Sequence, residues 1–357
     1  MEADKPGRPA GEGDAGDGPR APAAAPRGAG RTGLRWLVRL IGPAILVVVL
    51  VRSGDLGAVV TAVRRAALLP LLGAVALNAA MFQLKVLRWQ ALLRARGVVY
   101  RTGRAWSSFM ASVYVGMLTP GRVGDALRAQ YLRHDVGMGY AEGLALVVVD
   151  RLCDLYVLVA FVALGFVRFG AILAGKLGWV LGGCVALTLL GPLLFFVPGV
   201  AERLFGRLYG KLAPDRSAAG LSRFLVALRE QAGPRLVWPV VLSLVAFLVN
   251  YVQGWLVASA MGLETVTLYD VMCLMAIASM LGLLPISVSG IGVRELFFAL
   301  AFPLLGLPAE SGVGYGLLVF ATMHLAIVAA GFVAWQVAPP PTGVTAASSA
   351  PGSTGTT

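Results

Sequence analysis

Five long apolar runs in this chain each match the length of a helix that crosses a bilayer. They cover residues 68–93, 142–169, 172–197, 236–261 and 313–337. A helix needs about 20 mainly apolar residues to cross the hydrocarbon core, and its backbone hydrogen bonds close within the segment. The composition agrees, because 58% of the residues are hydrophobic, 13% are charged and the mean hydropathy is +0.79, unlike a soluble domain. The sequence therefore predicts an all-α polytopic membrane protein.

Two further apolar segments are interrupted by Pro and Gly. The first spans residues 105–118 and stops at Thr119-Pro120-Gly121, and the second spans 271–284, stops at Pro285 and restarts over 290–306. With residues 34–51, which have basic flanks and are predicted to be a signal anchor, the total is about seven to nine helical membrane segments.

The two termini differ in composition from the rest of the chain. Residues 1–33 are rich in Gly, Ala and Pro, and residues 339–357 in Pro, Thr, Ser and Gly. Such segments cannot bury a core and are predicted to be disordered. One membrane domain is expected over residues 34–338, and its polar stretch 198–235 is predicted to form an amphipathic helix on the cytoplasmic surface.

The excess of basic residues predicts an orientation. The 30 Lys and Arg against 18 Asp and Glu give a net charge of +12, and much of this excess flanks apolar segments, which favours membrane topology over binding to nucleic acid. Basic residues are retained in the cytoplasm, so the N-terminus is predicted to be cytoplasmic in the cell (inner or plasma) membrane, although Arg64 and Arg65 count against this orientation. The two interrupted segments then enter from opposite faces, which leads to the hypothesis of an inverted repeat.

The interruptions are candidate binding elements. Irregular backbone at membrane depth is tolerated only where it is buried in protein or borders a wet cavity, and a restarting helix directs free N–H groups and a positive dipole end into that space. We expect the broken-helix ends to bind a phosphate with the nearby arginines, while the acids pair with these arginines when the site is empty. The alternative is that Pro and Gly only mark loops. The breaks are Pro120, Gly121, Gly124, Pro285, Gly290 and Gly292, the arginines Arg122, Arg128 and Arg294, and the acids Asp125 and Glu295.

A second group of charges lies inside the run 142–169. Asp150 and Asp154 are four residues apart and share a helix face with Arg151 at its edge, so one carboxylate can neutralise the guanidinium while the other binds a ligand or a proton. Charges within spans indicate function by default, and the alternative is a structural ion pair between helices. Near the end of the run 68–93, Arg88 and Trp89, with Lys85, are interpreted as snorkelling to the interface.

No cofactor is predicted. Cys153, Cys184 and Cys273 lack metal-site spacing, and His134 and His324 are far apart. The Gly-rich segments match neither a phosphate-binding nor a dinucleotide-binding loop. Asn78, Asn250 and Gln253 are expected to form hydrogen bonds between helices.

In their order along the chain, these motifs resemble the lysylphosphatidylglycerol synthase transmembrane, or flippase-like, membrane proteins over about residues 35–338. The family commonly has Glu where this chain has Asp125 and Asp150, a change that keeps the charge. The matching positions are Arg88 and Trp89; Pro120, Arg122, Gly124, Asp125 and Arg128; Asp150, Arg151 and Asp154; and residues 285–295.

The resemblance implies a carrier that moves a phospholipid or other polar lipid between leaflets. Its multidomain members continue into a soluble aminoacyl-transfer domain, and this chain ends 20 residues after the run 313–337, so we expect no synthase activity. Two alternatives stay open: an intramembrane enzyme with Asp150 and Asp154 as acid and base, and a scaffold that works with partner proteins in envelope lipid biosynthesis.

Overall fold

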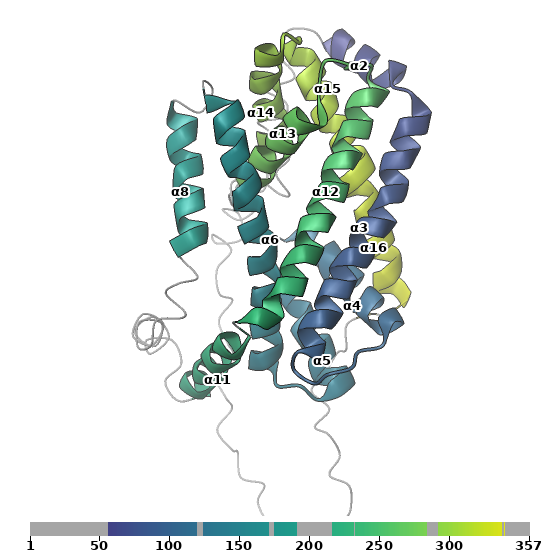
Figure 1. The fold of residues 1–357 in the computed structure, drawn as a ribbon. Coiled ribbons are helices and arrows are strands. Elements are labelled where there is room, and N and C mark those ends of the chain that lie inside the picture. The colour runs from purple at the N-terminus through teal and green to yellow at the C-terminus, as the bar shows by residue number, and fades with distance from the viewer. Residues whose placement is uncertain are drawn as a thin grey trace, which may run out of the picture. The chain divides into compact units, whose positions relative to one another are not determined.

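The computed structural model describes residues 56–119, 124–170, 175–190, 216–231, 233–283, 292–337 and 339. All of them belong to one compact unit, residues 38–357, and every element among them is a helix (Figure 1). The predicted all-α membrane fold is confirmed. The predicted anchor at 34–51 and both terminal tails lie outside the described residues.

Long helices form the body of the bundle. They are α3 (Leu68–Arg94), α6 (Tyr140–Arg168), α12 (Val237–Ala260) and the continuous run of α15 (Ala309–Val319), the π-helical turn η4 (Phe320–Leu325) and α16 (Ala326–Val337). By length and composition, Leu68–Arg94, Pro234–Ala260 and Ala309–Val337 can cross a membrane. Helix α6 is equally long but carries charges in its middle. The helix bounds agree with the apolar runs to within a few residues.

Helices α4 (Thr102–Leu118) and α5 (Leu127–Val136) form a hairpin. Thr119, which precedes Pro120, is extended (φ −107°, ψ 136°), because proline disfavours the helical conformation of the residue before it. At the other end of the hairpin, Tyr100 donates to Asp135 Oδ2 at 2.6 Å, and burial together with this bond raises the pKa of the Tyr100 phenol. The hairpin therefore enters and leaves the bundle at the same end.

Helices α13 (Leu268–Leu281) and α14 (Val293–Ala301) form a second pair in the other half of the chain. Thr267 begins α13 with a capping box, in which its Oγ1 accepts from Asp270 N–H and its own N–H donates to Asp270 Oδ2, both at 3.1 Å. Asp270 also pairs with Arg168 at the end of α6 (2.8 Å). This pair therefore starts from the end of the bundle opposite to that of the α4–α5 hairpin (Figure 1).

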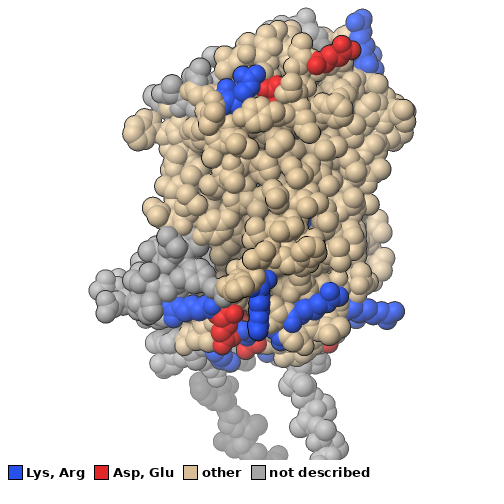
Figure 2. Space-filling model, in the orientation of Figure 1, with Lys and Arg blue, Asp and Glu red and all other residues tan. Residues whose placement is uncertain are grey.

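Basic residues gather at one end, which we call the basic end. There Arg96 pairs with Glu230 and Arg235 donates to the carbonyl of Ala95 (3.3 Å), which joins the end of α3 to α11 (Arg216–Glu230) and the start of α12. Figure 2 shows a wide band of mostly uncharged side chains between this end and the other. The basic residues here are Arg94, Arg96, Arg101, Arg104, Arg133, Arg223 and Arg235. This distribution is typical of a protein embedded in a bilayer.

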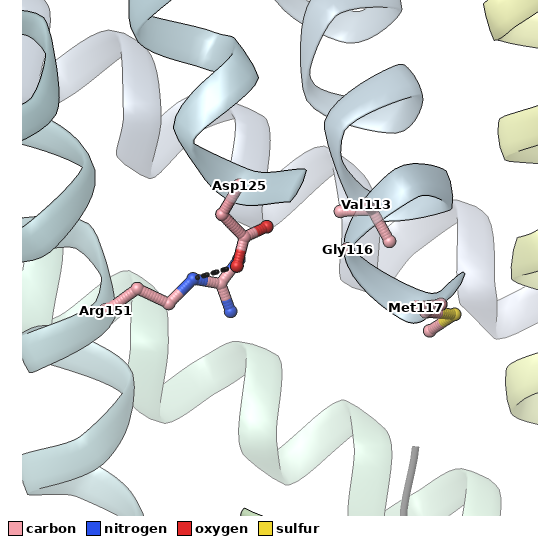
Figure 3. A pocket seen from close by; sticks show the side chains of 5 residues that line it. All are labelled: Val113, Gly116, Met117, Asp125 and Arg151. Carbon is pink, nitrogen blue, oxygen red and sulfur yellow. Dashed lines mark ion pairs between the residues drawn. The ribbon is translucent and has the colours of Figure 1, made fainter. Parts of the chain in front are cut away.

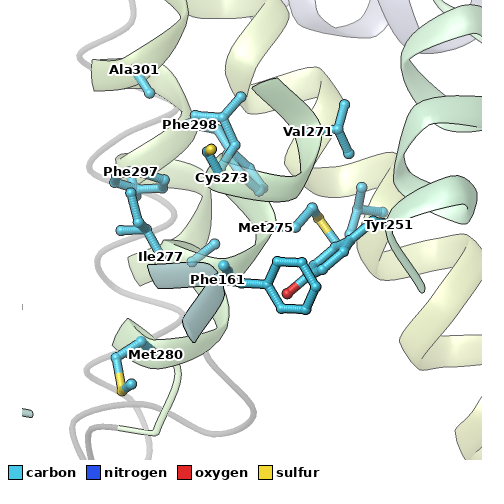
Figure 4. Packing of buried hydrophobic residues seen from close by; sticks show 14 of the residues in the cluster. Phe161, Tyr251, Val271, Cys273, Met275, Ile277, Met280, Phe297, Phe298 and Ala301 are labelled. Carbon is cyan, nitrogen blue, oxygen red and sulfur yellow. The ribbon is translucent and has the colours of Figure 1, made fainter. Parts of the chain in front are cut away.

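Two apolar cores hold the helices together. One surrounds α13 and α14 and includes Met275 and Phe298 (Figure 4). In it, Phe298 meets Tyr315 edge to face at 5.0 Å between ring centroids. The other surrounds the α4–α5 hairpin and includes Trp89 and Phe109. Each hairpin thus has its own packed environment.

Three smaller elements complete the described fold. Helix α2 (Leu56–Arg65) was not predicted, and α8 (Lys176–Leu190) is the described part of the run 172–197. Within the predicted amphipathic stretch 198–235, α11 buries Leu225 and Leu228 and exposes Arg223. Residues 216–230 thus form a helix with a buried apolar side, and its place on the cytoplasmic surface stays a prediction. Residues 198–215 lie outside the described residues.

Candidate functional site

Asp150 and Asp154 lie one turn apart on α6 and face Arg88 of α3. Arg88 Nε donates to Asp150 Oδ1 at 2.7 Å, its Nη2 donates to Asp154 Oδ2 at 3.1 Å, and Nη1 bonds Asp154 Oδ1. Nη1 also donates to Ser243 Oγ of α12 at 2.7 Å. Arg88 is 0% exposed, so this guanidinium joins three helices from inside the bundle.

Arg128 of α5 is the second buried guanidinium. Its Nη1 donates to Asp150 Oδ2 at 2.8 Å. Its guanidinium carbon lies 4.6 Å from the Trp89 ring centroid and 4.7 Å from that of Phe109, positions that favour a cation electrostatically. Its Nε and Nη2 are buried and have no hydrogen-bond partner among the described residues. Arg128 therefore keeps unused donors in a site that water does not reach.

Arg151 and Asp125 border a recess between α6 and the α4–α5 hairpin. Arg151 Nε lies 3.0 Å from Asp125 Oδ2. Val113, Gly116 and Met117 of α4 complete the lining (Figure 3). A water-sized sphere can occupy only about 10 Å³ of the recess, far less than the 300–1,000 Å³ of typical ligand pockets. In this conformation the protein's own carboxylate fills the position beside Arg151.

The charges of this cluster do not balance. Lys85 joins it at 3.3 Å from Asp154 Oδ2. Among the described residues, which leave out 120–123, four basic groups therefore face three acids, a surplus of one positive charge. The basic groups are Lys85, Arg88, Arg128 and Arg151, and the acids are Asp125, Asp150 and Asp154. Charges at membrane depth cost at least about 2.5–3.5 kcal/mol each on insertion scales and therefore face the protein interior. The cluster can accept one more anion without burying a net negative charge.

A separate pair of charges lies on α14. Arg294 Nη2 donates to Glu295 Oε1 at 2.6 Å, and Gly292 N–H donates to Glu295 Oε2 at 2.6 Å. Arg294 Nη1 lies 3.4 Å from His324 Nδ1, a residue of the π-helical turn η4, and such turns are frequent at functional sites. Arg294 and Glu295 are nearly fully buried.

The structure brings together part of the predicted site. Asp125, Arg128, Asp150, Arg151 and Asp154 form one cluster. Among the described residues, the ion pair and hydrogen bonds of Arg294 and Glu295 stay within α14, Gly292 and η4, so the predicted site residues form two separate groups. Arg122, Pro120, Gly121, Pro285 and Gly290 lie outside the described residues.

Two of the predicted breaks, Gly124 and Gly292, are described, and in each a side chain accepts the backbone N–H of the glycine. Gly292, at φ 85°, donates to Glu295, and Gly124 donates to Thr119 Oγ1 at 3.2 Å. A side chain at Gly124 would overlap the backbone of Gly116, so the predicted close backbone approach is present there. The prediction that both N–H groups are free for a phosphate is wrong in this conformation, because a side chain of the same hairpin accepts each one.

The interpretation of Arg88 and Trp89 as interfacial residues is wrong. Both are 0% exposed. Arg88 lies six residues before the end of α3, about 9 Å along the axis, so its side chain could reach the interface. The carboxylates of α6 bind it instead. Arg151 keeps the expected ion pair with Asp154, at 3.9 Å, but lies closer to Asp125, at 3.0 Å. The spacing of Lys85 and Arg88, three residues apart on one helix face, was the signal that could have placed them in the site.

A polar network crosses the bundle away from the charges. Gln253 donates to Asn78 Oδ1 (3.0 Å) and to the carbonyl of Ala74 (2.7 Å), and Asn78 donates to the carbonyl of Thr322 in η4 (2.9 Å). The expectation that Asn78 and Gln253 form hydrogen bonds between helices is confirmed. These bonds fix α3, α12 and η4 against one another.

Metal binding finds no support in the part of the chain that the structure covers. It holds no group of three or more His, Cys, Asp or Glu side chains that could hold an ion. Cys153 and Cys273 are buried free thiols, and the side chain of Cys184 lies outside the description.

Comparison with known proteins adds one finding. The sequence model described as "Lysylphosphatidylglycerol synthase TM region" matches residues 36–331. No curated protein gives a significant match.

Proposed function

The chain belongs to the lysylphosphatidylglycerol synthase transmembrane family, and on that premise we propose that it carries a phospholipid or another polar lipid between the leaflets of the cell membrane. The family and the apolar helices make it a membrane protein. Lipids are in direct contact with the surface of such a protein, which makes them the proposed cargo.

The buried charge cluster between α3, α5 and α6 is the observation on which the proposal depends. Arg88 is held by two carboxylates, whereas Arg128 keeps two buried donors without partners and Arg151 borders a recess. A stable bundle has no need of a surplus buried cation, since apolar residues of similar volume often stabilise as well as a buried ion pair. A carrier of an anionic head group does need one.

The two hairpins supply the framework for transport. We take α4–α5 and α13–α14 to be re-entrant elements that enter the membrane from opposite faces, as the halves of an inverted repeat do. The charge distribution supports a cytoplasmic basic end and a cytoplasmic N-terminus. In this arrangement a head group enters sideways, its phosphate contacts arginines in the interior and its acyl chains stay in lipid.

We further propose that the protein is a carrier and not an enzyme. Asp150 and Asp154 both accept hydrogen bonds from Arg88, and a paired carboxylate is stabilised as an anion. Such an anion is a poor general acid, which disfavours the acid and base pair considered from the sequence.

Translocation by purified protein tests the proposal. Full-length protein is reconstituted into vesicles that contain fluorescent phosphatidylglycerol, and the accessible fraction is measured by chemical quenching. Arg151→Ala removes the proposed charge-assisted hydrogen bonds from this guanidinium to the lipid phosphate. Such bonds are worth about 1.5–3 kcal/mol, so the translocation rate should fall about tenfold or more.

Arg168→Ala is the matched control, because it removes an arginine from the same helix whose partner, Asp270, lies at the other end. It should retain the wild-type rate to within about twofold, since exposed ion pairs contribute little. Equal rates for Arg151→Ala and wild type would contradict the carrier. Chemically altered lipid, detected by mass spectrometry, would favour the enzyme, and neither activity would favour the scaffold.

A further inference from the structure

Asp125 differs from the other two carboxylates of the cluster in its number of partners. Asp150 bridges Arg88 and Arg128, and Asp154 contacts Arg88, Lys85 and, at 3.9 Å, Arg151. Among the described residues, which leave out 120–123, Asp125 has one ion pair, with Arg151. Of the three, its carboxylate can leave with the loss of the fewest contacts.

The Arg151–Asp125 contact also leaves hydrogen-bonding capacity unused. Arg151 Nε and Asp125 Oδ2 are 3.0 Å apart. They are not aligned for a hydrogen bond, and Nε has no other hydrogen-bond partner among the described residues. A guanidinium has five N–H donors in a planar fork that matches two oxygens of a phosphate. A phosphodiester could therefore gain bonds that Asp125 does not make.

The position of Asp125 blocks the recess. Its carboxylate lies among the lining residues (Figure 3), and its Oδ1 would lie 3.4 Å from a Cβ added at Gly116. An anion that binds Arg151 Nε from the recess therefore meets this carboxylate and competes with it. Gly124, the preceding residue, packs directly against the backbone of Gly116, so the main chain beside Asp125 is fixed and its side chain is the part that can rotate.

We infer that Asp125 is a resident competitor: its carboxylate occupies Arg151 in the empty carrier, and the singly charged phosphodiester of a lipid head group displaces it. The inference rests on the proposed function, whose site it deepens. The surplus positive charge of the cluster allows both anions to be present during the exchange. Competition keeps Arg151 paired when no lipid is bound and weakens lipid binding enough to permit release.

Binding of short-chain phosphatidylglycerol to the full-length protein in detergent, measured by calorimetry, tests this inference. Asp125→Asn keeps the shape of the side chain and removes its charge. We expect the apparent Kd to fall about tenfold, equivalent to about 1.4 kcal/mol. Arg151→Ala should abolish binding. Asp270→Asn, the same change at the other carboxylate paired with an α6 arginine, should leave the Kd unchanged, and melting curves without lipid verify that each variant is folded.

The outcomes separate the two claims. A Kd for Asp125→Asn that is unchanged or higher than that of wild type would overturn the competitor role, even if the wild type translocates lipid. Tighter binding by Asp125→Asn with no translocation by the wild type would leave the competitor and remove the carrier. Inorganic phosphate is the second probe, and if it competes at equal concentration the ligand is a free phosphate and the lipid assignment fails.

Discussion

Replacement of Arg88 by Met is the most demanding test of the buried cluster. Methionine has a similar length and no charge, so Arg88→Met largely preserves packing and removes the group that joins α3, α6 and α12. Asp150 keeps Arg128 as a partner, and Asp154 keeps Lys85. The substitution therefore leaves two carboxylates that are buried and only partly compensated.

The expected loss of stability follows from the contacts. Arg88 makes three hydrogen bonds to carboxylate oxygens, and bonds to charged groups contribute about 1.5–3 kcal/mol each. Because Asp150 keeps Arg128, and Asp154 keeps Lys85 and, at 3.9 Å, Arg151, the measured range for breaking a buried pair, about 3–5 kcal/mol, is the better guide. At roughly 2–4 °C per kcal/mol, Tm should fall by at least about 6 °C.

The buried thiols provide the assay. Cys153 and Cys273 are 3% and 0% exposed, so in a Cys184→Ser background a thiol-reactive dye reports only when the bundle opens. Detergent-solubilised protein is heated with the dye, and Arg88→Met is compared with Arg168→Met. The Arg168 side chain is 42% exposed, and its buried partner Asp270 keeps hydrogen bonds from the N–H and Oγ1 of Thr267. The loss of stability should therefore be smaller than for Arg88→Met.

A double substitution tests whether the loss of stability comes from the broken charge pair. Arg88→Met combined with Asp154→Asn removes the charges of both partners, so the loss should be smaller than the sum of the single losses by about 0.5–3 kcal/mol. If Arg88→Met lowers Tm no more than Arg168→Met does, or if the two changes are additive, the cluster does not hold the helices together and the reasoning fails.

Two further substitutions test the packing around the site. Gly124→Ala should destabilise the protein by about 1–3 kcal/mol, because the added methyl group overlaps the backbone of Gly116. Gly183→Ala, which has open space around it, should stabilise the protein by about 0.5–1 kcal/mol. Equal shifts in Tm for the two variants would contradict the close approach of Gly124 to Gly116. Asn78→Leu removes the donor to the Thr322 carbonyl, and leaving that buried acceptor unpaired should cost about 1–3 kcal/mol in the same melting assay, so an unchanged Tm would show that the bond contributes nothing.

The candidate site was only partly predictable. Asp150, Arg151 and Asp154 could be found because charges inside an apolar run are conspicuous on any helix. The distance of Arg88 from the helix end fits both the interface and the interior, so only its spacing from Lys85 on one helix face pointed to the site. Whether Arg88 faces the interface or the interior depended on Asp150 and Asp154, which are 62 and 66 residues away in the chain.

The sequence by itself determined the class, the helix bounds and the breaks, because these depend on local properties. Apolar length sets α3 and α12, and proline forces the extended conformation at Thr119. Only the tertiary structure decided which charge meets which: Arg151 faces Asp125, and Arg294 stays with Glu295 on its own hairpin. Ion pairs form between whichever side chains the packed helices bring within about 4 Å, and a linear pattern does not contain that distance.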